Sequence, residues 1–383
     1  MNPSDFAPSS PGRLVSVGPP DVAYHAFVPA PLPPAFDWSP RLIAEMSLAD
    51  RALGELAGLG RTLPNPHLLI GPFTRREALL TSRIEGSEAS MSDLVLFEAN
   101  PTSERDVRDA REVSNYIRAL EHGLSRLKSL PLSLRLLREI HAILLQGVRG
   151  GNLTPGEFRT SQNWIGPAGS NLRTATFVPP PVDELLPALD AFEKFLHAPA
   201  EIPLLARLAL LHYQFETIHP FLDGNGRVGR LLVTLVLCGE SVLPGPLLYI
   251  SAPIERRREE YYARLIGVTR RGEWTAWIEF FLQVGREAAL DGVTRAHRLV
   301  ALREEFRARL QSVGTSPLPL RIADALFTWP ALNTARVCEL LGISQVAAMS
   351  HLRRLEAAKI LREATGQKRN LVFIADEIVR IME

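Results

Sequence analysis

Residues 219–230 read His-Pro-Phe-Leu-Asp-Gly-Asn-Gly-Arg-Val-Gly-Arg, and the interpretation of the whole chain starts from this stretch. An apolar stripe at helical spacing precedes it, formed by Leu204, Leu208, Leu211, Phe215 and Ile218. Pro220 limits the extent of that helix, and a second helix is expected from Arg227 to Leu237. The stretch is therefore predicted to be a glycine-rich turn that joins two buried helices.

The glycines of this turn match G-x-G-x-x-G, the fingerprint of a dinucleotide-binding site, at Gly224, Gly226 and Gly229. That fingerprint requires a β-strand immediately before it, because the phosphate binds to the turn between that strand and the following helix. Here the preceding segment is helical. The sequence therefore argues against a Rossmann site.

A metal cluster is a second alternative, because His212, Glu216, His219 and Asp223 fall at helical spacings. The turn interrupts the helix before Asp223 can share a face with His212 and Glu216, and no H-E-x-x-H pair exists. We therefore expect His212 to be a helix-packing histidine and not a metal ligand.

The residues of the turn do support an anion site. Glycines on both sides of Asn225 let backbone N–H groups converge, at the positive end of the following helix. Arg227 and Arg230 are three residues apart, so both guanidinium groups can face one polyphosphate. Asp223 can hold Mg²⁺ that bridges phosphates, and His219 is placed to take a proton from an attacking hydroxyl. This combination is typical of nucleotidyl transfer.

The stretch resembles the signature of the Fic (Fido-fold) family, H-P-F-x-[D/E]-G-N-G-R-x-x-R, at every fixed position. The resemblance extends over roughly residues 40–290. It includes IGPAGSNLRTATFVPPP at 165–181, which is similar to the family's target-docking flap. It also includes the helical stretches RRREEYYARL at 256–265 and GEWTAWIEFFL at 272–282.

The resemblance implies a protein adenylyltransferase that moves AMP from ATP, with Mg²⁺, onto a Tyr, Ser or Thr hydroxyl of a target protein or of itself. His219 would be the general base and Asp223 the metal ligand, and Gly226, where a kinase-like branch has lysine, favours AMP transfer over phosphate transfer. The implied nucleotide-binding residues are Asp223, Gly224, Asn225, Gly226, Arg227, Val228, Gly229 and Arg230 from the motif, Tyr261 and Tyr262 near the adenine, and Thr176 and Phe177 from the flap.

A second short string, Thr81-Ser82-Arg83-Ile84-Glu85-Gly86, lies upstream. A glutamate in the last helical turn before a glycine cap is common and by itself says little. The string also resembles the family's inhibitory motif, [S/T]-x-x-x-E-[G/N], on an N-terminal helix. The resemblance implies that Glu85 pairs with Arg230 and blocks placement of the γ-phosphate, while Thr81 helps to fix the helix. An alternative role for Glu85 is to position water that removes AMP from modified targets.

The chain divides into five segments, and the expected fold class is mainly α: a Fic-like helical core with a short β-hairpin flap, followed by a small winged helix-turn-helix. A proline-rich lead with ten prolines, expected to be extended, covers 1–40. The flap is the only β structure expected in the first 300 residues. The other segments are an N-terminal helical region with the inhibitory helix at 41–130, the catalytic core at 131–290, a helix and linker at 291–315 and the winged helix at 316–383.

Within these segments the apolar periodicity predicts several further helices. The predicted helices are 132–145, 185–196, 256–271, 274–289 and 293–310, with a linker at 312–319.

The C-terminal segment could contact DNA, which makes a nucleotide-sensing DNA-binding regulator the alternative function. A recognition helix that starts near Ser344 would expose Gln345, Ser350, Arg353 and Arg354, and the wing would offer Lys368 and Arg369. The segment has nine basic and seven acidic residues, and 9 − 7 gives only +2. A role in protein contact or in assembly of a homodimer is an equal alternative.

Composition adds little about function. The 383 residues carry 43 basic and 42 acidic side chains, a formal charge of +1, so no global field draws the chain to nucleic acid or to an acidic membrane. The 46% hydrophobic and 22% charged residues are typical of a globular protein. Cys238 and Cys338 are expected to be buried fillers, and the absence of an apolar leader or membrane span predicts a cytoplasmic protein.

Overall fold

A computed structural model describes residues 1–62, 67–100, 107–199, 201–311, 317–367 and 369–383, and it is mainly helical, as the sequence predicted. The helices of the N-terminal and central parts are α1 (Pro40–Thr62), α2 (His67–Ile84), α3 (Met91–Ala99), α4 (Val107–Arg126), α5 (Leu134–Leu144), α6 (Val182–Leu196), α7 (Leu204–Ile218) and α8 (Asn225–Gly239). The remaining helices are α9 (Ser251–Arg256), α10 (Arg258–Arg271), α11 (Trp274–Gln311), α12 (Pro317–Ala325), α13 (Thr334–Leu341), α14 (Gln345–Ala357) and α15 (Asp376–Met382).

Helices α7 and α8 form the centre of the molecule. Nearly every residue of both helices is buried, including the charged side chains of Arg207, Arg227 and Arg230. Helix α7 packs against α6, α8 and α11, and α8 packs against α4, α5 and α2. The helix predicted over 204–218 is confirmed, and so are those predicted to begin near residues 132, 185 and 227. The glycine-rich turn of the motif thus lies between two core helices.

The expectation of an extended lead segment without β structure is wrong. A short 3₁₀ turn (Pro3–Asp5) precedes an antiparallel hairpin of β1 (Gly12–Val17) and β2 (Tyr24–Pro29). The prolines at 19 and 20 fall in the connection between the strands, where they remove no ladder donor. Strand β2 buries Ala26 and Phe27 completely, and the Phe27 N–H donates to the Val178 carbonyl at 2.9 Å. The hairpin is therefore part of the packed structure.

The flap forms as one antiparallel bridge and not as a longer hairpin. Ile165 and Phe177 exchange two backbone hydrogen bonds of 2.9 and 3.0 Å. The residues between them make turns, in which Asn171 Oδ1 accepts hydrogen bonds from the N–H groups of Arg173 and Thr174. The tip of the flap is thus held by local contacts.

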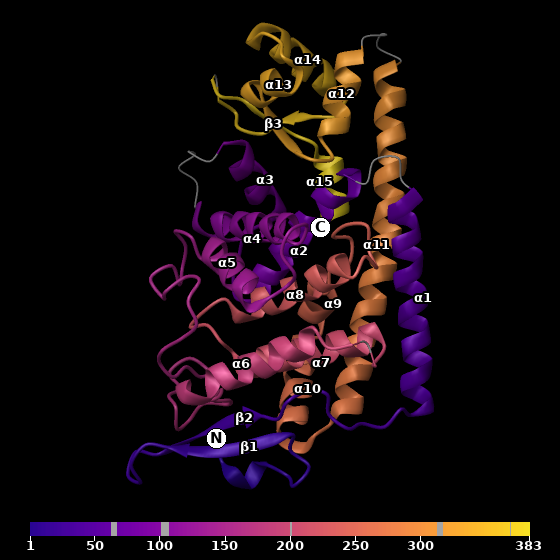
Figure 1. Cartoon of the computed structure of the whole chain (residues 1–383). Helices are drawn as coiled ribbons and strands as arrows, with labels where there is room; N and C mark the ends of the chain where they lie inside the picture. The colour runs from indigo at the N-terminus through magenta and orange to yellow at the C-terminus, as the bar shows by residue number, and fades with distance from the viewer. Residues whose placement is uncertain (63–66, 101–106, 200, 312–316, 368) are drawn as a thin grey trace.

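Helix α11 is one continuous helix of 38 residues, where two helices had been expected. Gly292 does not break it, and a Cβ at that position would lie 3.2 Å from Leu56 Cδ1 of α1, so the small residue lets the two helices approach closely. The helix predicted over 256–271 is confirmed as α10, which begins two residues later, at Arg258, directly after the short helix α9. Figure 1 shows α11 beside α1 along one side of the molecule.

The C-terminal region lies at the opposite end of the molecule from the N-terminal hairpin (Figure 1). Helices α12 to α14 come before β4 (Arg362–Glu363) and β5 (Val372–Ile374), which form a three-stranded sheet with β3 (Ala331–Asn333) in the order β3-β5-β4. Helix α12 begins at Pro317, inside the predicted linker, whose residues 312–316 lie outside the described residues. The region packs on α3, where Asn333 Nδ2 donates to the Ala99 carbonyl at 2.7 Å.

Two smaller predictions concern the cysteines and the membrane. Cys238 and Cys338 have free thiols, but both are only partly buried. Among the described residues no helix combines the length and apolarity that crossing a membrane requires.

Candidate active site

The motif turn is held in an unusual backbone conformation. His219 follows the last residue of α7 in the left-handed region, at φ 49° and ψ 61°, which is uncommon for a residue with a Cβ. Gly224 has φ 78° and caps α8. Between them the Asn225 side chain closes the loop, because its Oδ1 accepts from the Phe221 N–H and its Nδ2 donates to the Phe221 carbonyl, both at 2.8 Å. The amide of Asn225 is thus committed to the loop, and only its backbone N–H can face an anion.

The His219 ring has one nitrogen free to act as a base. Its Nδ1 lies 3.2 Å from the Glu216 carbonyl, which can only accept, so Nδ1 carries the proton and Nε2 keeps its lone pair. Burial lowers the pKa of His219 to about 4, with the nearby Arg159 charge acting in the same direction. The imidazole is therefore neutral at pH 7, as a general base must be before it takes a proton.

Within the described part of the chain, the start of α8 offers donors that have no hydrogen-bond partner. The first α-helical hydrogen bond of α8 runs from the Val228 N–H to the Gly224 carbonyl, so the N–H groups of residues 225–227 precede the first turn. Arg227 is 1% exposed, and its buried Nε and Nη1 have no hydrogen-bond partner among the residues that the structure describes. The carboxylate oxygen Oε2 of Glu112 lies 3.6 Å from Arg227 Nη1, and Oδ1 of Asp223 lies 3.4 Å from Arg227 Nη2. This half of the turn has the donors of an anion-binding site.

Arg230 is equally buried, but its Nε and Nη2 are hydrogen-bonded within the protein. Its Nε donates to Thr81 Oγ1 at 2.7 Å, and its Nη2 donates to the Thr81 carbonyl at 3.2 Å and to Glu85 Oε1 at 2.6 Å. Burial raises the pKa of Glu85, but the charge and hydrogen bond of Arg230 outweigh it, so that pKa lies below its ordinary value. The structure thus brings together Thr81, Glu85 and Arg230, the three residues that the resemblance grouped.

Glu85 also lies directly over the anion-binding turn. A Cβ at position 226 would come within 2.4 Å of Glu85 Oε1 and 3.0 Å of Arg230 Nη1. Glycine at this position is what allows the carboxylate and the guanidinium to meet above the turn.

Asp223 fits the role of a magnesium ligand. Its side chain is 31% exposed, and its Oδ1 accepts the Gly224 N–H at 2.6 Å. Mg²⁺ prefers oxygen donors and is commonly held by one or two carboxylates together with substrate phosphates and water. Over the described part of the chain no group of three or more His, Cys, Asp or Glu side chains forms a site of its own. An ion held here would therefore need phosphate oxygens as well.

A cavity of about 410 Å³ lies beside the motif, between the flap, the end of α7 and α10. Its lining includes Thr176 and Phe177 from the flap and Tyr262 from α10, three of the predicted nucleotide-binding residues. Tyr261 is not part of the lining, because its side chain is buried and its hydroxyl contacts His212 Nε2 at 2.9 Å. Of the two tyrosines expected near the adenine, Tyr262 alone lines the cavity, and its contact with the adenine stays a prediction.

Two motif residues face the core and not the cavity. Val228 is fully buried among apolar side chains, and the Gly229 carbonyl accepts a hydrogen bond from His212 Nδ1 at 3.2 Å. His212 also stacks on Trp277, at 6.1 Å between ring centroids. His212 is therefore a packing histidine, as the sequence predicted.

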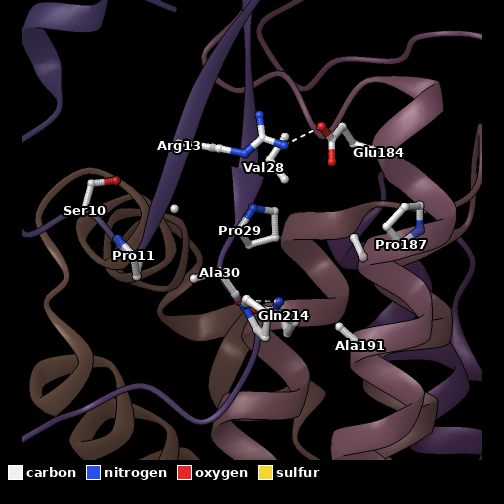
Figure 2. Close-up of a pocket in the computed structure, with 13 residues that line it drawn as sticks. Ser10, Pro11, Arg13, Val28, Pro29, Ala30, Glu184, Pro187, Ala191 and Gln214 are labelled. Carbon is white, nitrogen blue, oxygen red and sulfur yellow. Dashed lines mark hydrogen bonds and ion pairs between the residues drawn. The ribbon is translucent and has the colours of Figure 1, made fainter.

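A larger cavity of about 540 Å³ lies away from the motif (Figure 2). It lies between the N-terminal hairpin and helices α6 and α7, and the Arg13–Glu184 ion pair crosses it. Gln214 lines its floor and donates to the Ala30 carbonyl at 3.0 Å. Its lining shares no residue with that of the 410 Å³ cavity, so the two cavities are distinct.

Sequence reasoning missed several residues that shape the site. His141 of α5 stacks on Phe221 at 3.8 Å, and its Nε2 donates to the Asp223 carbonyl at 3.0 Å. Glu216 lines the 410 Å³ cavity, and burial raises its pKa to about 7. Arg159 and Asn163 both donate to the His219 carbonyl. The only signal was polar residues in the otherwise irregular stretch GEFRTSQN at 156–163.

The predicted DNA-contacting residues are less free than the sequence indicated. Gln345 and Ser350 of α14 are exposed, and Ser344 caps the helix by accepting from the Ala347 N–H at 3.3 Å. Arg353, however, donates to Glu356 at 2.7 Å and lies over the Phe373 ring. Arg354 is half-buried and Arg369 is exposed, and Lys368 lies outside the described residues. Contact with DNA stays a prediction.

Comparisons with known proteins agree with the geometry. The model of the Fic/DOC family N-terminal region matches residues 43–125, and that of the Fic/DOC family matches residues 131–237. The chain is 25% identical over 205 residues to "Protein adenylyltransferase Fic" of Drosophila grimshawi, covering 51% of this chain and 38% of the relative. It is 28% identical over 195 residues to "Protein adenylyltransferase fic-1" of Caenorhabditis briggsae, covering 48% and 34%. The chain thus spans well under half the length of these curated relatives.

Solved structures show the same fold at low identity. A Fic family protein from Desulfovibrio desulfuricans has a TM-score of 0.59 at 19% identity, covering 90% of this chain and 98% of that one. Fic-1 from C. elegans (residues 134–508) has a TM-score of 0.51 at 20% identity, covering 69% and 75%.

Proposed function

The chain belongs to the Fic/DOC family, and we propose that it is a protein adenylyltransferase that moves AMP from ATP to a hydroxyl side chain of a target protein or of itself. One observation carries the proposal. His219 Nε2 can accept a proton, and the same short stretch holds buried donors of Arg227, four residues after Asp223, that have no hydrogen-bond partner among the described residues. A base next to an anion site is the arrangement that hydroxyl attack on a phosphorus atom requires.

The chemical step follows from this placement. His219 Nε2 takes the proton of the target hydroxyl, the hydroxyl oxygen attacks the α-phosphorus of ATP, and pyrophosphate leaves. The N–H groups of residues 225–227 and the guanidinium of Arg227 bind the phosphate oxygens, where negative charge develops. Mg²⁺ held by Asp223 would neutralise phosphate charge. His141 and Asn225 keep the Asp223 and Phe221 backbone in place for this binding.

The nucleoside is assigned to the 410 Å³ cavity. Its walls are Phe177, Leu265 and Ile266 with the polar edges of Thr176 and Tyr262, a lining that suits a flat purine and a ribose. The bridge between Ile165 and Phe177 lies at the rim, where an extended target segment can add to the flap by backbone hydrogen bonds.

Glu85 acts as an internal inhibitor in this proposal. Its carboxylate occupies the position on Arg230 that a γ-phosphate would take, and it lies over Gly226 at the start of α8. ATP then binds without its β- and γ-phosphates in line for attack. Displacement of Glu85 frees Arg230 and allows the productive arrangement.

The test is intact-mass spectrometry of the Glu85→Gly chain after incubation with ATP and Mg²⁺. We expect a mass increase of one AMP on the chain itself. The matched control is Glu85→Gly with His219→Ala, which should bind ATP with the same affinity and add no AMP. Equal AMP addition by both chains contradicts the role of His219. ATP binding without AMP addition by the Glu85→Gly chain favours the nucleotide-sensing DNA-binding regulator instead.

A further inference from the structure

Two buried side chains from the segment before the flap hold the loop that carries His219. Arg159 Nε donates to the His219 carbonyl at 3.0 Å. Asn163 Nδ2 donates to the same carbonyl at 3.2 Å and to the Phe221 carbonyl at 2.9 Å. Arg159 is 2% exposed and Asn163 is 8% exposed, so water does not compete for these bonds. The carbonyl groups just beyond the end of α7 thus find their donors in another segment.

The same segment also holds the other side of the flap. Arg159 Nη2 donates to the Pro180 carbonyl at 2.6 Å, and Gln162 Nε2 donates to the Pro179 carbonyl at 3.0 Å. The Arg159 backbone N–H donates in addition to the Pro220 carbonyl at 2.9 Å. Both flanks of the flap are therefore bonded, directly or through Arg159, to the loop at 219–221.

The backbone of His219 needs such support. A non-glycine residue in the left-handed region is strained, and this conformation persists only where its surroundings fix it. The two hydrogen bonds to the His219 carbonyl come from Arg159 and Asn163, and the ring is oriented by the Glu216 carbonyl.

We propose that Arg159, together with Asn163, is a positioning residue that couples the flap to His219, so that a hydroxyl docked on the flap meets Nε2 at the correct distance. The inference rests on the proposed AMP transfer. Proton transfer requires the two heavy atoms to lie within roughly 2.6–3.2 Å of each other. A misplacement of about 1 Å can cost about 100-fold in rate. Arg159 does not touch the anion-binding turn at 225–227, so its effect should appear in kcat and not in ATP affinity.

The experiment introduces Arg159→Lys and Arg159→Met into the Glu85→Gly chain. A lysine can keep one of the two side-chain bonds and the charge, whereas a methionine keeps neither. With saturating ATP we expect kcat for self-modification to fall about 10-fold in the lysine variant and about 100-fold in the methionine variant. ATP affinity, measured by calorimetry, should stay within about two-fold.

A matched control is Arg138→Met, because Arg138 binds the beginning of the same segment. Its Nε donates to the Gly156 carbonyl at 2.7 Å, and its Nη2 pairs with Glu157. This variant should leave kcat within about two-fold of the parent. Asn163→Ala removes two bonds to the loop without removing a charge, so it provides the same test if Arg159→Met does not fold.

Two results overturn the inference. One is an unchanged kcat in both Arg159→Lys and Asn163→Ala. The other is a loss of ATP affinity that matches the loss in kcat, because that pattern indicates a general collapse of the site.

Hydrogen exchange tests the coupling of the flap to His219 without any AMP transfer. It therefore distinguishes failure of this coupling from failure of the proposed AMP transfer. In Arg159→Lys, amides of the flap and of the loop at 219–224 should both exchange faster than in the parent, while Arg138→Met should change only the region near Gly156. Unchanged exchange in the flap and the loop of Arg159→Lys would overturn the coupling even if the parent chain transfers no AMP.

Discussion

Arg227 and Arg230 lie one helical turn apart on α8, and both are 1% exposed, yet their surroundings differ. Arg230 makes three hydrogen bonds to α2 and to Glu85, which follows α2. Among the described residues, Arg227 Nε and Nη1 have no hydrogen-bond partner, although Glu112 Oε2 lies 3.6 Å from Nη1 and Nη2 donates to Asp223 Oδ1 at 3.4 Å. We call the Arg230 side of the anion site the occupied half, because the Glu85 carboxylate fills it, and the Arg227 side the available half.

The difference shows how one site can be assembled and still restrained. A buried guanidinium whose N–H groups are unpaired has a high cost, and that cost is recovered when an anion binds. At Arg230 the Glu85 carboxylate accepts a hydrogen bond at 2.6 Å, whereas at Arg227 the carboxylates of Asp223 and Glu112 stand at 3.4 and 3.6 Å and leave Nε and Nη1 without a hydrogen-bond partner among the described residues. The contact of Glu85 with Arg230 therefore restrains one end of a bound polyphosphate. The other end can still bind at Arg227.

The largest expected effect comes from removing the available half. Arg227→Ala in the Glu85→Gly chain should lower the rate of AMP transfer by roughly 100-fold to 1,000-fold, the cost of one donor to a developing negative charge. Self-modification with labelled ATP measures it. The control is Arg207→Ala, which removes a buried arginine of α7 that pairs with Glu240 far from the turn. An equal loss in the control would show that Arg227 has only a structural role.

The occupied half should respond in the opposite direction. Glu85→Gly removes a hydrogen-bonded partner of a buried charge, an interaction of about 1.5–3 kcal/mol, so AMP transfer should rise about 10-fold to 100-fold. Glu85→Gln keeps an acceptor without the charge and should give an intermediate rise. Glu88→Gln changes an exposed neighbour and should have no effect. Wild-type rates in Glu85→Gly would rule out the inhibitory role.

A substitution at Thr81 tests how far the contacts of Arg230 depend on helix α2. Thr81→Val keeps the shape but removes the acceptor of Arg230 Nε, which should destabilise the fold by about 1–3 kcal/mol in a melting experiment and raise basal AMP transfer a little. Thr74 lies on the same helix as Thr81 and is hydrogen-bonded to the buried Tyr249 hydroxyl. Thr74→Val removes that bond and should destabilise the fold to a similar extent. If Thr74→Val also raises AMP transfer, the effect belongs to α2 in general and not to the contact with Arg230.

The smallest effect is a pH dependence at Glu216, a second carboxylate near Arg230. Burial raises its pKa to about 7, above the ordinary value of 4.5, so the folded chain holds a proton that the unfolded chain releases between these pH values. Stability should therefore fall as pH rises from 4.5 to 7, and Glu216→Gln should remove that loss. We expect Glu216→Gln to raise the melting temperature by a few degrees at pH 8 and not at pH 4. An equal gain at both pH values would contradict the assignment.

The sequence predicted much of this site because its residues lie within twelve positions of one another. The spacing of His219, Asp223, Arg227 and Arg230 follows from one turn and one helix, which local sequence specifies. The pairing of Glu85 with Arg230 joins residues 145 positions apart, and it was predicted only through the resemblance of a short upstream string.

The residues that sequence reasoning missed make long-range contacts. The stretch at 156–163 has no periodicity that distinguishes Arg159 from a surface arginine, and its role appears only when its hydrogen bonds to His219 and Pro180 are seen. The N-terminal hairpin was missed for a related reason. Its prolines argued against strands, but they fall in a connection and at a strand end, and β2 is stabilised by burial against residues near Val178.

By itself the sequence determined the helical class, the glycine-rich turn and the chemical types gathered in it, because helical periodicity and turn residues act over a few positions. Only the tertiary structure decided which donors of Arg227 lack a hydrogen-bond partner among the described residues, which tyrosine reaches the cavity and what holds His219 in a left-handed conformation. These features depend on burial and on hydrogen bonds between distant segments, and the energies of such contacts are fixed by the packed structure and not by local sequence.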